Sequence, residues 1–357
     1  MNSQTRAGGQ TPRSTGATKR AAGAAFDLLL KLRAMLALVL LVFIFSLATS
    51  SFLTSNNLSI LAKHVSMNAF LAIGMTFVML AGGIDLSVGS VVGLAGMVAG
   101  WLLTRGVTLP GSSHPYYPPV VVVILGALAV SGAVGLLNGL LITRLSTAPF
   151  IATLGTLYVA RGAGLLLSGG RTFPNLAGDT SRHNGGFPEI GQSFLMGVPV
   201  PVWLLLVLVV VAAVVASKTP FGRHVYAVGG NERASLLAGI RVDRVKVLTY
   251  VTSSLCAGIV GLIIAAQLEA AHPATGESFE LTAIAAVVLG GTSLAGGRGS
   301  VWGSLMGAFV IGVLADGLVM LGTSEFWQMV IKGIVIIAAV AIDQLQASAH
   351  LRVARSR

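Results

Sequence analysis

Hydrophobic positions in this chain form ten long runs, separated by short polar segments. A helix needs about 20 mostly apolar residues to cross a hydrocarbon core of about 30 Å, and most of the runs approach that length. The pattern therefore predicts an all-α, polytopic membrane protein with about ten transmembrane helices. The runs are Ala34–Leu53, Leu58–Leu80, Leu86–Thr104, Pro119–Thr143, Ile151–Ser168, Val200–Ser217, Val247–Leu268, Leu281–Ala295, Val301–Leu321 and Phe326–Ile342.

The eighth run, Leu281–Ala295, is too short to span a membrane comfortably. Irregular backbone at membrane depth is tolerated only inside protein or along a water-filled cavity. We therefore expect this run to form a re-entrant or broken helix packed inside the bundle.

The charges between the runs indicate how the helices are oriented. With the N-terminus inside, most of the 23 lysines and arginines lie in segments on the cytoplasmic side. Cytoplasmic loops of membrane proteins are enriched in these residues, so we predict that both termini are cytoplasmic. The segments predicted to lie outside hold Lys63, Arg105, Arg171 and Arg182.

The predicted organisation is a single transmembrane domain over residues 34–345. Residues 1–33 are polar and basic and are predicted to be a disordered cytoplasmic N-terminus, and residues 346–357 a cytoplasmic tail. Two longer connections stand out, an outer loop over residues 169–199 and a cytoplasmic loop over residues 218–246.

Composition excludes several classes of protein. The chain is 54% hydrophobic and only 10% charged, against about 25% charged in soluble domains, so an ordinary soluble enzyme is excluded. The net charge of +11 is explained by basic cytoplasmic loops, and we do not expect nucleic-acid binding. The single cysteine, Cys256, excludes an internal disulfide.

The cytoplasmic loop contains a candidate docking helix. Asn231 is suited to cap a short helix, and Gly239 is suited to end it. Ala234 and Ala238 share an apolar face, with Leu237, while Glu232 and Arg233 point away. Such a helix fits a groove in a partner protein; the alternative is a helix that lies in the lipid interface.

Two glycine-rich segments between apolar runs resemble each other. Each has Gly-Gly, a short polar turn, and then Gly-Ser-Val-x-Gly opening the next run, which suggests an internal duplication of the kind found in transporters. We predict that they act as hinges or gates; the alternative is that the glycines serve close helix packing alone. The residues are Gly82, Gly83, Asp85 and Gly89 in the first, and Gly290, Gly291, Gly296, Gly297 and Arg298 in the second.

A few polar residues fall inside apolar runs. Arg161, Lys332 and Asp316 must face the bundle interior, water or one another, because exposing a charge to lipid is costly. Asn68, Asn138 and Asp316 are candidates for a polar translocation path. Interhelical hydrogen bonding without a transport role is the alternative for each of the three.

Signatures of catalysis or cofactor binding are not found in the sequence. The run from Gly291 to Arg298 resembles the start of a phosphate-binding loop, but Gly297 stands where the required lysine would be. The six histidines are scattered, without metal-ligand spacing. We therefore predict that the chain is not an enzyme and has no catalytic, cofactor-binding or metal site of its own.

Three motifs, at residues 74–90, 230–240 and 285–300, resemble the membrane permeases of bacterial ABC importers for monosaccharides. Within that family, which includes xylose, arabinose, galactose, inositol and autoinducer permeases, the ribose permeases are the most similar. The resemblance runs from about Leu36 to Asp343. Two features depart from the family pattern: the stretch from Asn175 to Val198, and Asp316, where the family is expected to have Asn. The identity of the sugar is therefore left open.

The resemblance implies a permease subunit in the bacterial inner membrane that moves a monosaccharide by alternating access. It implies two permease copies, identical or related, a cytoplasmic ATPase subunit that binds ATP and Mg²⁺, and a periplasmic sugar-binding protein. It also assigns the helix from Asn231 to Gly239 to coupling with the ATPase. The alternatives are an ion-gradient-driven transporter, with Asp85, Asp316 or Asp343 as candidate ion ligands, and a channel or membrane scaffold.

Overall fold

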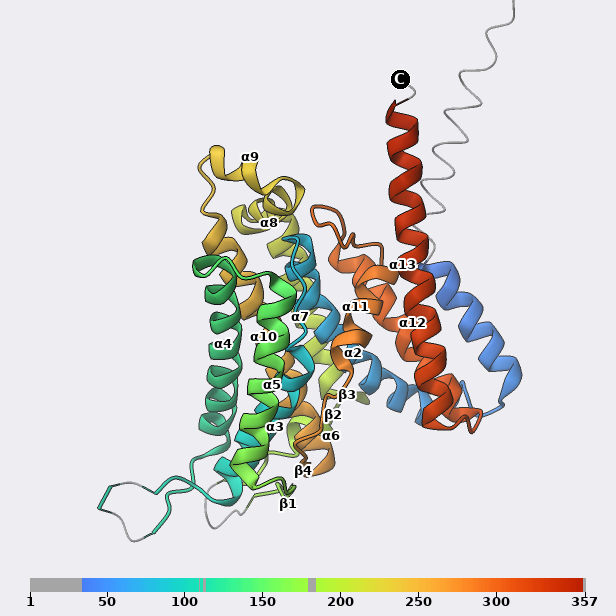
Figure 1. Ribbon diagram of the computed structural model, residues 1–357. Coiled ribbons are helices and arrows are strands. Elements are labelled where there is room, and N and C mark those ends of the chain that lie inside the picture. Colours follow the sequence, from blue (N-terminus) through green and yellow to red (C-terminus); the bar gives the residue numbers. More distant parts are fainter. Residues whose placement is uncertain (1–33, 109, 112–113, 179–183, 356–357) are drawn as a thin grey trace, which may run out of the picture.

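The computed structural model describes residues 34–357 apart from 109, 112–113, 179–183 and 356–357, and it is a bundle of helices (Figure 1). Each of the ten predicted runs contains one helix, so the all-α polytopic fold is confirmed. The expectation for residues 1–33 lies outside the described residues. The helices are Ala34–Ala48, α2 (Ser55–Leu80), α3 (Val88–Thr104), α4 (Val120–Arg144), α5 (Pro149–Ser168), α7 (Val200–Lys218), α10 (Val242–Leu268), α11 (Phe279–Leu289), α12 (Val301–Met320) and α13 (Glu325–Arg355).

The helix lengths agree with a membrane-spanning bundle. Helices α2, α4, α5, α7, α10 and α12 are each long and apolar enough to cross a membrane by length and composition. The helix Ala34–Ala48, α3 and α11 are apolar but shorter. Helix α11 has 11 residues, about 16 Å, so it cannot span the hydrocarbon core by itself.

Element boundaries differ from the sequence-based prediction in several places. The first helix ends at Ala48 rather than Leu53, and α10 begins at Val242, because its polar first turns continue the helix beyond the apolar run. Helix α13 continues to Arg355, through most of the segment predicted as a tail. The 218–246 loop contains two helices, α8 (Pro220–Gly230) and α9 (Glu232–Leu237), of which only the second was predicted.

The core is built on α2, α10 and α12. Large apolar side chains such as Phe70, Met75 and Ile263 are fully buried among these helices. Small residues bring the backbones together: a Cβ added at Gly74 would lie 3.0 Å from both the Cβ of Cys256 and the Cα of Ser253. Close approach through small residues is the usual packing mode of membrane helices, because lipid offers no hydrophobic drive for association.

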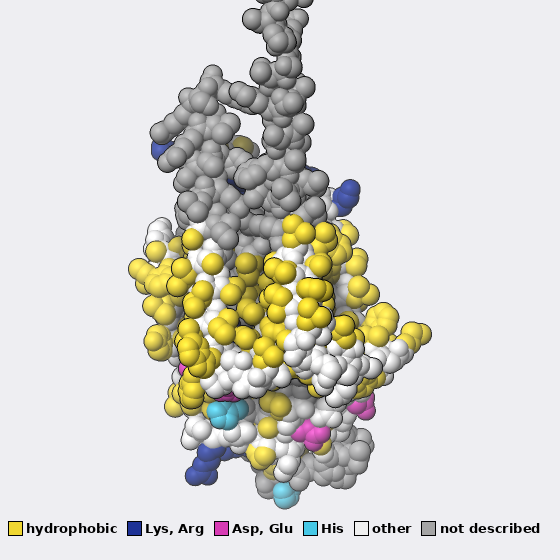
Figure 2. All heavy atoms as spheres, turned by 90° about the vertical axis from the view of Figure 1, so that its right-hand side faces the viewer, with side chains coloured by type: hydrophobic (Ala, Val, Ile, Leu, Met, Phe, Trp, Pro, Cys, Tyr) yellow, Lys and Arg dark blue, Asp and Glu magenta, His cyan; other side chains and the backbone are white. Residues whose placement is uncertain are grey.

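Large apolar side chains also cover the outside of the bundle. Leu47, Leu166 and Ile337 are each more than two-thirds exposed. Figure 2 shows one face, on which hydrophobic side chains form a broad band and histidine and charged side chains gather below it. An apolar band bordered by polar groups is what a bilayer requires, so the described surface agrees with a membrane protein.

Short strands lie in the loops at the end of the bundle opposite to α8 and α9. Strand β1 (Phe173–Pro174) pairs antiparallel with β4 (Ala270–Ala271), and β2 (Phe194–Leu195) pairs with β3 (Val198–Pro199). A single-turn helix, α6 (Glu189–Gln192), lies between β1 and β2 in sequence. The β1–β4 pair ties the 169–199 loop to the segment that follows α10.

Candidate functional site: two glycine hinges and the α8–α9 segment

Helix α9 has the cap and the end that the sequence predicts. The side chain of Asn231 accepts a hydrogen bond from the backbone N–H of Ala234 at 2.9 Å. Gly239 follows the helix with φ +82°, a left-handed conformation that glycine adopts without strain. The helix is therefore fixed at both ends by local sequence, although it has only six residues.

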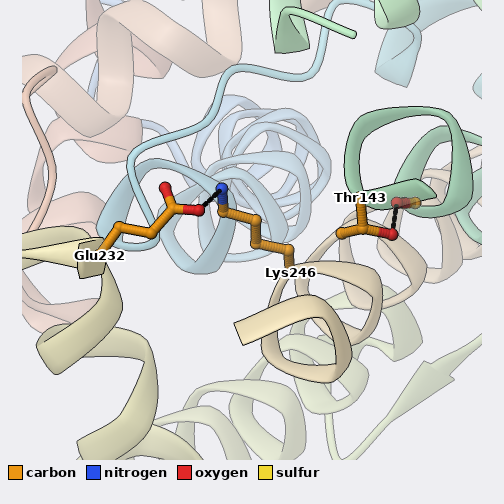
Figure 3. Close-up of polar contacts among 4 residues, drawn as sticks. Thr143, Glu232 and Lys246 are labelled. Atoms are coloured by element: carbon orange, nitrogen blue, oxygen red, sulfur yellow. Dashed lines mark hydrogen bonds and ion pairs between the residues drawn. The ribbon is translucent and has the colours of Figure 1, made fainter. Parts of the chain in front are cut away.

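One ion pair ties α9 to α10. The ammonium group of Lys246 lies 2.7 Å from a carboxylate oxygen of Glu232, while Thr143 on α4 uses its hydroxyl to bond the carbonyl of Gly139 (Figure 3). The Lys246 side chain is 18% exposed and that of Glu232 is 56% exposed. A pair this exposed contributes at most about 1 kcal/mol, so it sets the direction of α9 more than it stabilises the fold.

Large apolar side chains are exposed on α9. Leu236 is 62% and Leu237 is 84% exposed, and Ala234 and Ala238 of the predicted apolar face are exposed too. Arg233, on the same helix, is also exposed. Two exposed leucines at the tip of the molecule are typical of a surface that contacts another protein or the lipid interface.

The first glycine segment is fixed by a buried carboxylate. Asp85 is fully buried and accepts hydrogen bonds from the Ser87 N–H at 3.0 Å, the Ser87 hydroxyl at 2.6 Å and the Ser253 hydroxyl at 2.9 Å. Ser253 belongs to α10, so the carboxylate fastens the turn between α2 and α3 to a central helix. Gly83 lies against the Tyr250 hydroxyl, so a side chain at this position would require Tyr250 to shift.

Asn138 extends this network to α4 and α5. Its amide donates to the Ser87 hydroxyl at 2.8 Å, and its carbonyl oxygen accepts from the Thr156 hydroxyl at 2.5 Å. Asn138 is fully buried. Its hydrogen-bonding groups are engaged with protein partners, which is the arrangement expected of an interhelical link.

The two other candidates for a translocation path lie together, away from Asn138. Asn68 and Asp316 line one groove of about 370 Å³ between α2, α11, α12 and α13. A carboxylate oxygen of Asp316 accepts from the Asn57 amide at 2.9 Å, and Lys332 lines the same groove. The groove thus combines a mostly apolar lining with several polar and ionisable side chains.

The second glycine segment touches the first. The N–H of Gly297 donates to the carbonyl of Leu80 at 3.0 Å, and a Cβ at Gly296 would meet the backbone of Gly82 at 2.9 Å. The carbonyl of Arg298 closes the turn by accepting from the Ser293 N–H at 2.9 Å, while the Arg298 side chain is exposed. The remaining glycines of this segment, Gly290 and Gly291, lie at the end of α11, and Gly290 packs against Gly303 of α12.

Helix α8 completes a junction of three backbones. A Cβ at Gly229 would overlap the carbonyl of Leu80 and lie 2.6 Å from the N–H of Gly297. The Tyr226 hydroxyl, one turn earlier, donates to the carbonyl of Gly299 at 3.0 Å. We call the contact of Leu80–Gly82, Gly229–Gly230 and Gly296–Gly297 the glycine junction. It joins both hinges to the helix that leads into α9.

Sequence reasoning missed several members of this site. Ser87, Ser253 and Thr156 are ordinary hydroxyl residues in apolar runs, and no local pattern marks them as partners of Asp85 or Asn138. Gly229 and Gly230 sit in a Gly-Gly pair like those of the two hinges, and that repetition was the available signal.

Comparisons with known proteins identify the family. The family described as "Branched-chain amino acid transport system / permease component" matches residues 57–340. The chain belongs to this family. It is 44% identical to the ribose import permease protein RbsC of Bacillus subtilis over 314 residues, covering 88% of this chain and 92% of that protein.

Other relatives are also sugar permeases by name. RbsC of Escherichia coli K12 is 38% identical over 322 residues, covering 88% of this chain and 94% of that protein. The D-allose transport system permease protein AlsC of the same organism is 35% identical over 309 residues, covering 86% and 90%. No solved structure matches the chain significantly.

Proposed function

We propose that this chain is the inner-membrane permease subunit of an ABC importer for ribose or a closely related monosaccharide. The 44% identity to a ribose import permease along nearly the whole of both chains carries the proposal. The chain works with a second permease copy, cytoplasmic ATPase subunits and a periplasmic sugar-binding protein. It is not an enzyme, because ATP and Mg²⁺ are bound by the ATPase subunit.

The exposed leucines of α9 are the contact with the ATPase. Their position favours this role: Leu236 and Leu237 are presented to the outside, and α9 follows α8, whose last residues belong to the glycine junction. A displacement of α9 by the closing ATPase pair is passed through Gly229 to the two hinges. Access to the sugar path then alternates between the two sides of the membrane.

The loaded sugar-binding protein docks at the opposite end, on the 169–199 loop. The β2–β3 hairpin favours this, because Phe194 and Met196 are exposed at 54% and 88%. Lys63 of α2 lies 4.9 Å over the Phe194 ring, so the hairpin rests on a helix that runs directly to the first hinge.

Reconstitution in proteoliposomes tests the proposal. The full complex, with its ATPase and binding protein, is expected to accumulate radiolabelled ribose only when ATP is hydrolysed on the ATPase side. Uptake driven by a proton gradient with no ATPase present would overturn the proposal and favour an ion-coupled transporter. Leu237→Ser should lower ATP-dependent uptake, with Leu166→Ser, on a face away from α9, as the matched control.

A further inference from the structure

Two neighbouring grooves open at the end of the bundle that carries α8 and α9 (Figure 1). The α4–α10 groove, of about 320 Å³, lies between the last turn of α4 and the first turns of α10. The α8–α10 groove, of about 430 Å³, lies between α8, the turn after α9 and α10. Arg244 and Leu248 of α10 line both, so the two grooves meet on one face of that helix.

The polar side of the two grooves is basic. Arg144 and Arg244 line the α4–α10 groove, and Arg241 and Arg244 line the α8–α10 groove; all three arginines are exposed. Asp243 also lines the α4–α10 groove. Among the residues that the structure describes, none forms an ion pair or a hydrogen bond with these three guanidinium groups. Three cations against one carboxylate leave the grooves with an excess of positive charge that is available to an anion.

The other side of the grooves is apolar and continues onto two long apolar helices. Leu140, one turn before Arg144, lines the α4–α10 groove and is 40% exposed. Leu248, one turn after Arg244, is 50% exposed. Both α4 and α10 are long and apolar enough to cross a membrane. On each helix the change from arginine to leucine takes one turn, about 5.4 Å, so the grooves lie where lipid headgroups give way to hydrocarbon.

We propose that the two grooves bind an anionic phospholipid of the cytoplasmic leaflet, with its phosphate on the three arginines and its acyl chains along the two leucines. Arginine binds phosphate through two parallel N–H donors, and basic pockets at the cytoplasmic ends of membrane helices suit anionic headgroups. A soluble anion would need the arginines alone. The leucines one turn away favour a molecule that is charged at one end and apolar at the other.

The grooves are also less suited to the ATPase than the tip of α9 is. Figure 1 shows α9 beyond the end of α4, so its exposed leucines extend further from the membrane than the grooves do. A protein docked on α9 is separated from the hydrocarbon boundary by the headgroup layer. The grooves lie at that boundary, where lipid is the abundant partner.

A bound lipid would contact the end of α9. Ala238 and Gly239, at which α9 ends, line the α8–α10 groove together with Arg241. An occupied groove therefore fixes the foot of α9 against α10, where the Glu232–Lys246 ion pair already sets its direction. ATP-driven uptake should then depend on anionic lipid. This consequence rests on the proposed function, whereas the binding itself does not.

Lipid binding to the full-length, delipidated permease in neutral detergent tests the site. Phosphatidylglycerol should raise the unfolding temperature more than phosphatidylcholine does. Arg144→Gln, Arg241→Gln and Arg244→Gln should each weaken phosphatidylglycerol binding about fivefold, the effect of removing one basic residue near an anionic surface. Arg223→Gln, exposed on α8 and outside both grooves, is the matched control and should bind as the wild type does.

The same measurements can overturn the proposal. Equal affinities for the two lipids would do so, and so would an equal loss of affinity in the control and in the three groove variants. Without lipid, all four variants should unfold at the wild-type temperature, because the substituted side chains are exposed. A loss of binding is therefore not a loss of folding.

Two competitors separate phospholipid from other occupants. Glycerol phosphate carries the phosphate without acyl chains, so it should displace phosphatidylglycerol only at concentrations about a hundredfold higher. Displacement at equal concentrations would assign the grooves to a soluble phosphate and overturn the proposal. The variant with all three arginines replaced by glutamine should bind the ATPase with wild-type affinity in lipid-free detergent. A loss there would assign the arginines to the ATPase contact instead.

Transport in proteoliposomes tests the consequence for α9. Uptake by the wild-type complex should fall when phosphatidylglycerol is replaced by phosphatidylcholine, and the triple variant should be insensitive to the exchange. Equal sensitivity of the two complexes would overturn the link between the grooves and α9. If the wild-type complex transported no monosaccharide in either lipid, the proposed function would fail while the binding results remained, so the two failures are distinct.

Discussion

The two glycine hinges have nearly the same sequence pattern and very different surroundings. The first is fastened by the buried carboxylate of Asp85, which joins α3 to α10 and, through Ser87 and Asn138, to α4 and α5. The second carries its charge, Arg298, on an exposed side chain and touches its neighbours mainly through backbone. The comparison leads us to predict that the first segment is an anchored pivot and that the second moves against it.

The largest difference between the hinges should appear on removing their charged side chains. Asp85→Ala leaves the buried hydroxyls of Ser87 and Ser253 without their acceptor, so we expect a loss of about 3 kcal/mol or more in stability, measured by thermal unfolding in detergent. Arg298→Ala, at the second hinge, should change stability by less than about 0.5 kcal/mol. Similar losses in both variants would remove the distinction between pivot and moving element.

The next largest effect concerns the junction where the hinges meet α8. Gly229→Ala places a methyl group on the carbonyl of Leu80, and we expect a cost of about 1–3 kcal/mol together with loss of ATP-driven uptake. Gly230→Ala is the matched control, because a Cβ there would meet nothing within 4 Å. Uptake and unfolding temperature should be measured for both. Equal behaviour would show that the junction does not depend on backbone contact.

A smaller effect is expected at the far end of the coupling segment. Leu237→Ser removes an exposed apolar side chain and should leave unfolding unchanged while weakening ATPase association about tenfold, a loss typical of a contact at an interface. Arg233→Ala, on the same helix, is the control. Pull-down of the ATPase by detergent-solubilised permease measures the affinity. Undiminished binding by Leu237→Ser would exclude the leucine from the interface.

The smallest effect is expected for the pair that directs α9. Glu232→Gln and Lys246→Met, alone and combined, should give a coupling energy of about 0.2–1 kcal/mol, because the Glu232 side chain is more than half exposed. The effect should decline at high salt. Chemical unfolding at two ionic strengths supplies the measurement, and a coupling above about 2 kcal/mol would show a stronger structural role than the exposure implies.

The fold could be predicted from sequence to a large extent. The apolar runs are long, and a long apolar run in lipid has to form a helix to satisfy its backbone hydrogen bonds. Asn231 and Gly239 could be recognised as helix ends because capping is local. The partners of Asp85 could not, since Ser253 is 168 positions away and serine has many uses in membrane helices. Asn138 shows the same limit of sequence reasoning. The sequence shows a polar residue within an apolar run, but only the packing shows that it is a buried interhelical link and does not line a translocation path.

The glycine junction also bears on how such a permease can diversify. Its contacts are made by backbone atoms, which cannot change rotamer as side chains can. A displacement of α8 should therefore be passed to the two glycine segments with little loss. Asn68 and Asp316 line a groove that contains none of the residues of the junction. Side chains there can be exchanged without changing the backbone contacts of the junction, so the groove and the junction can vary independently of each other.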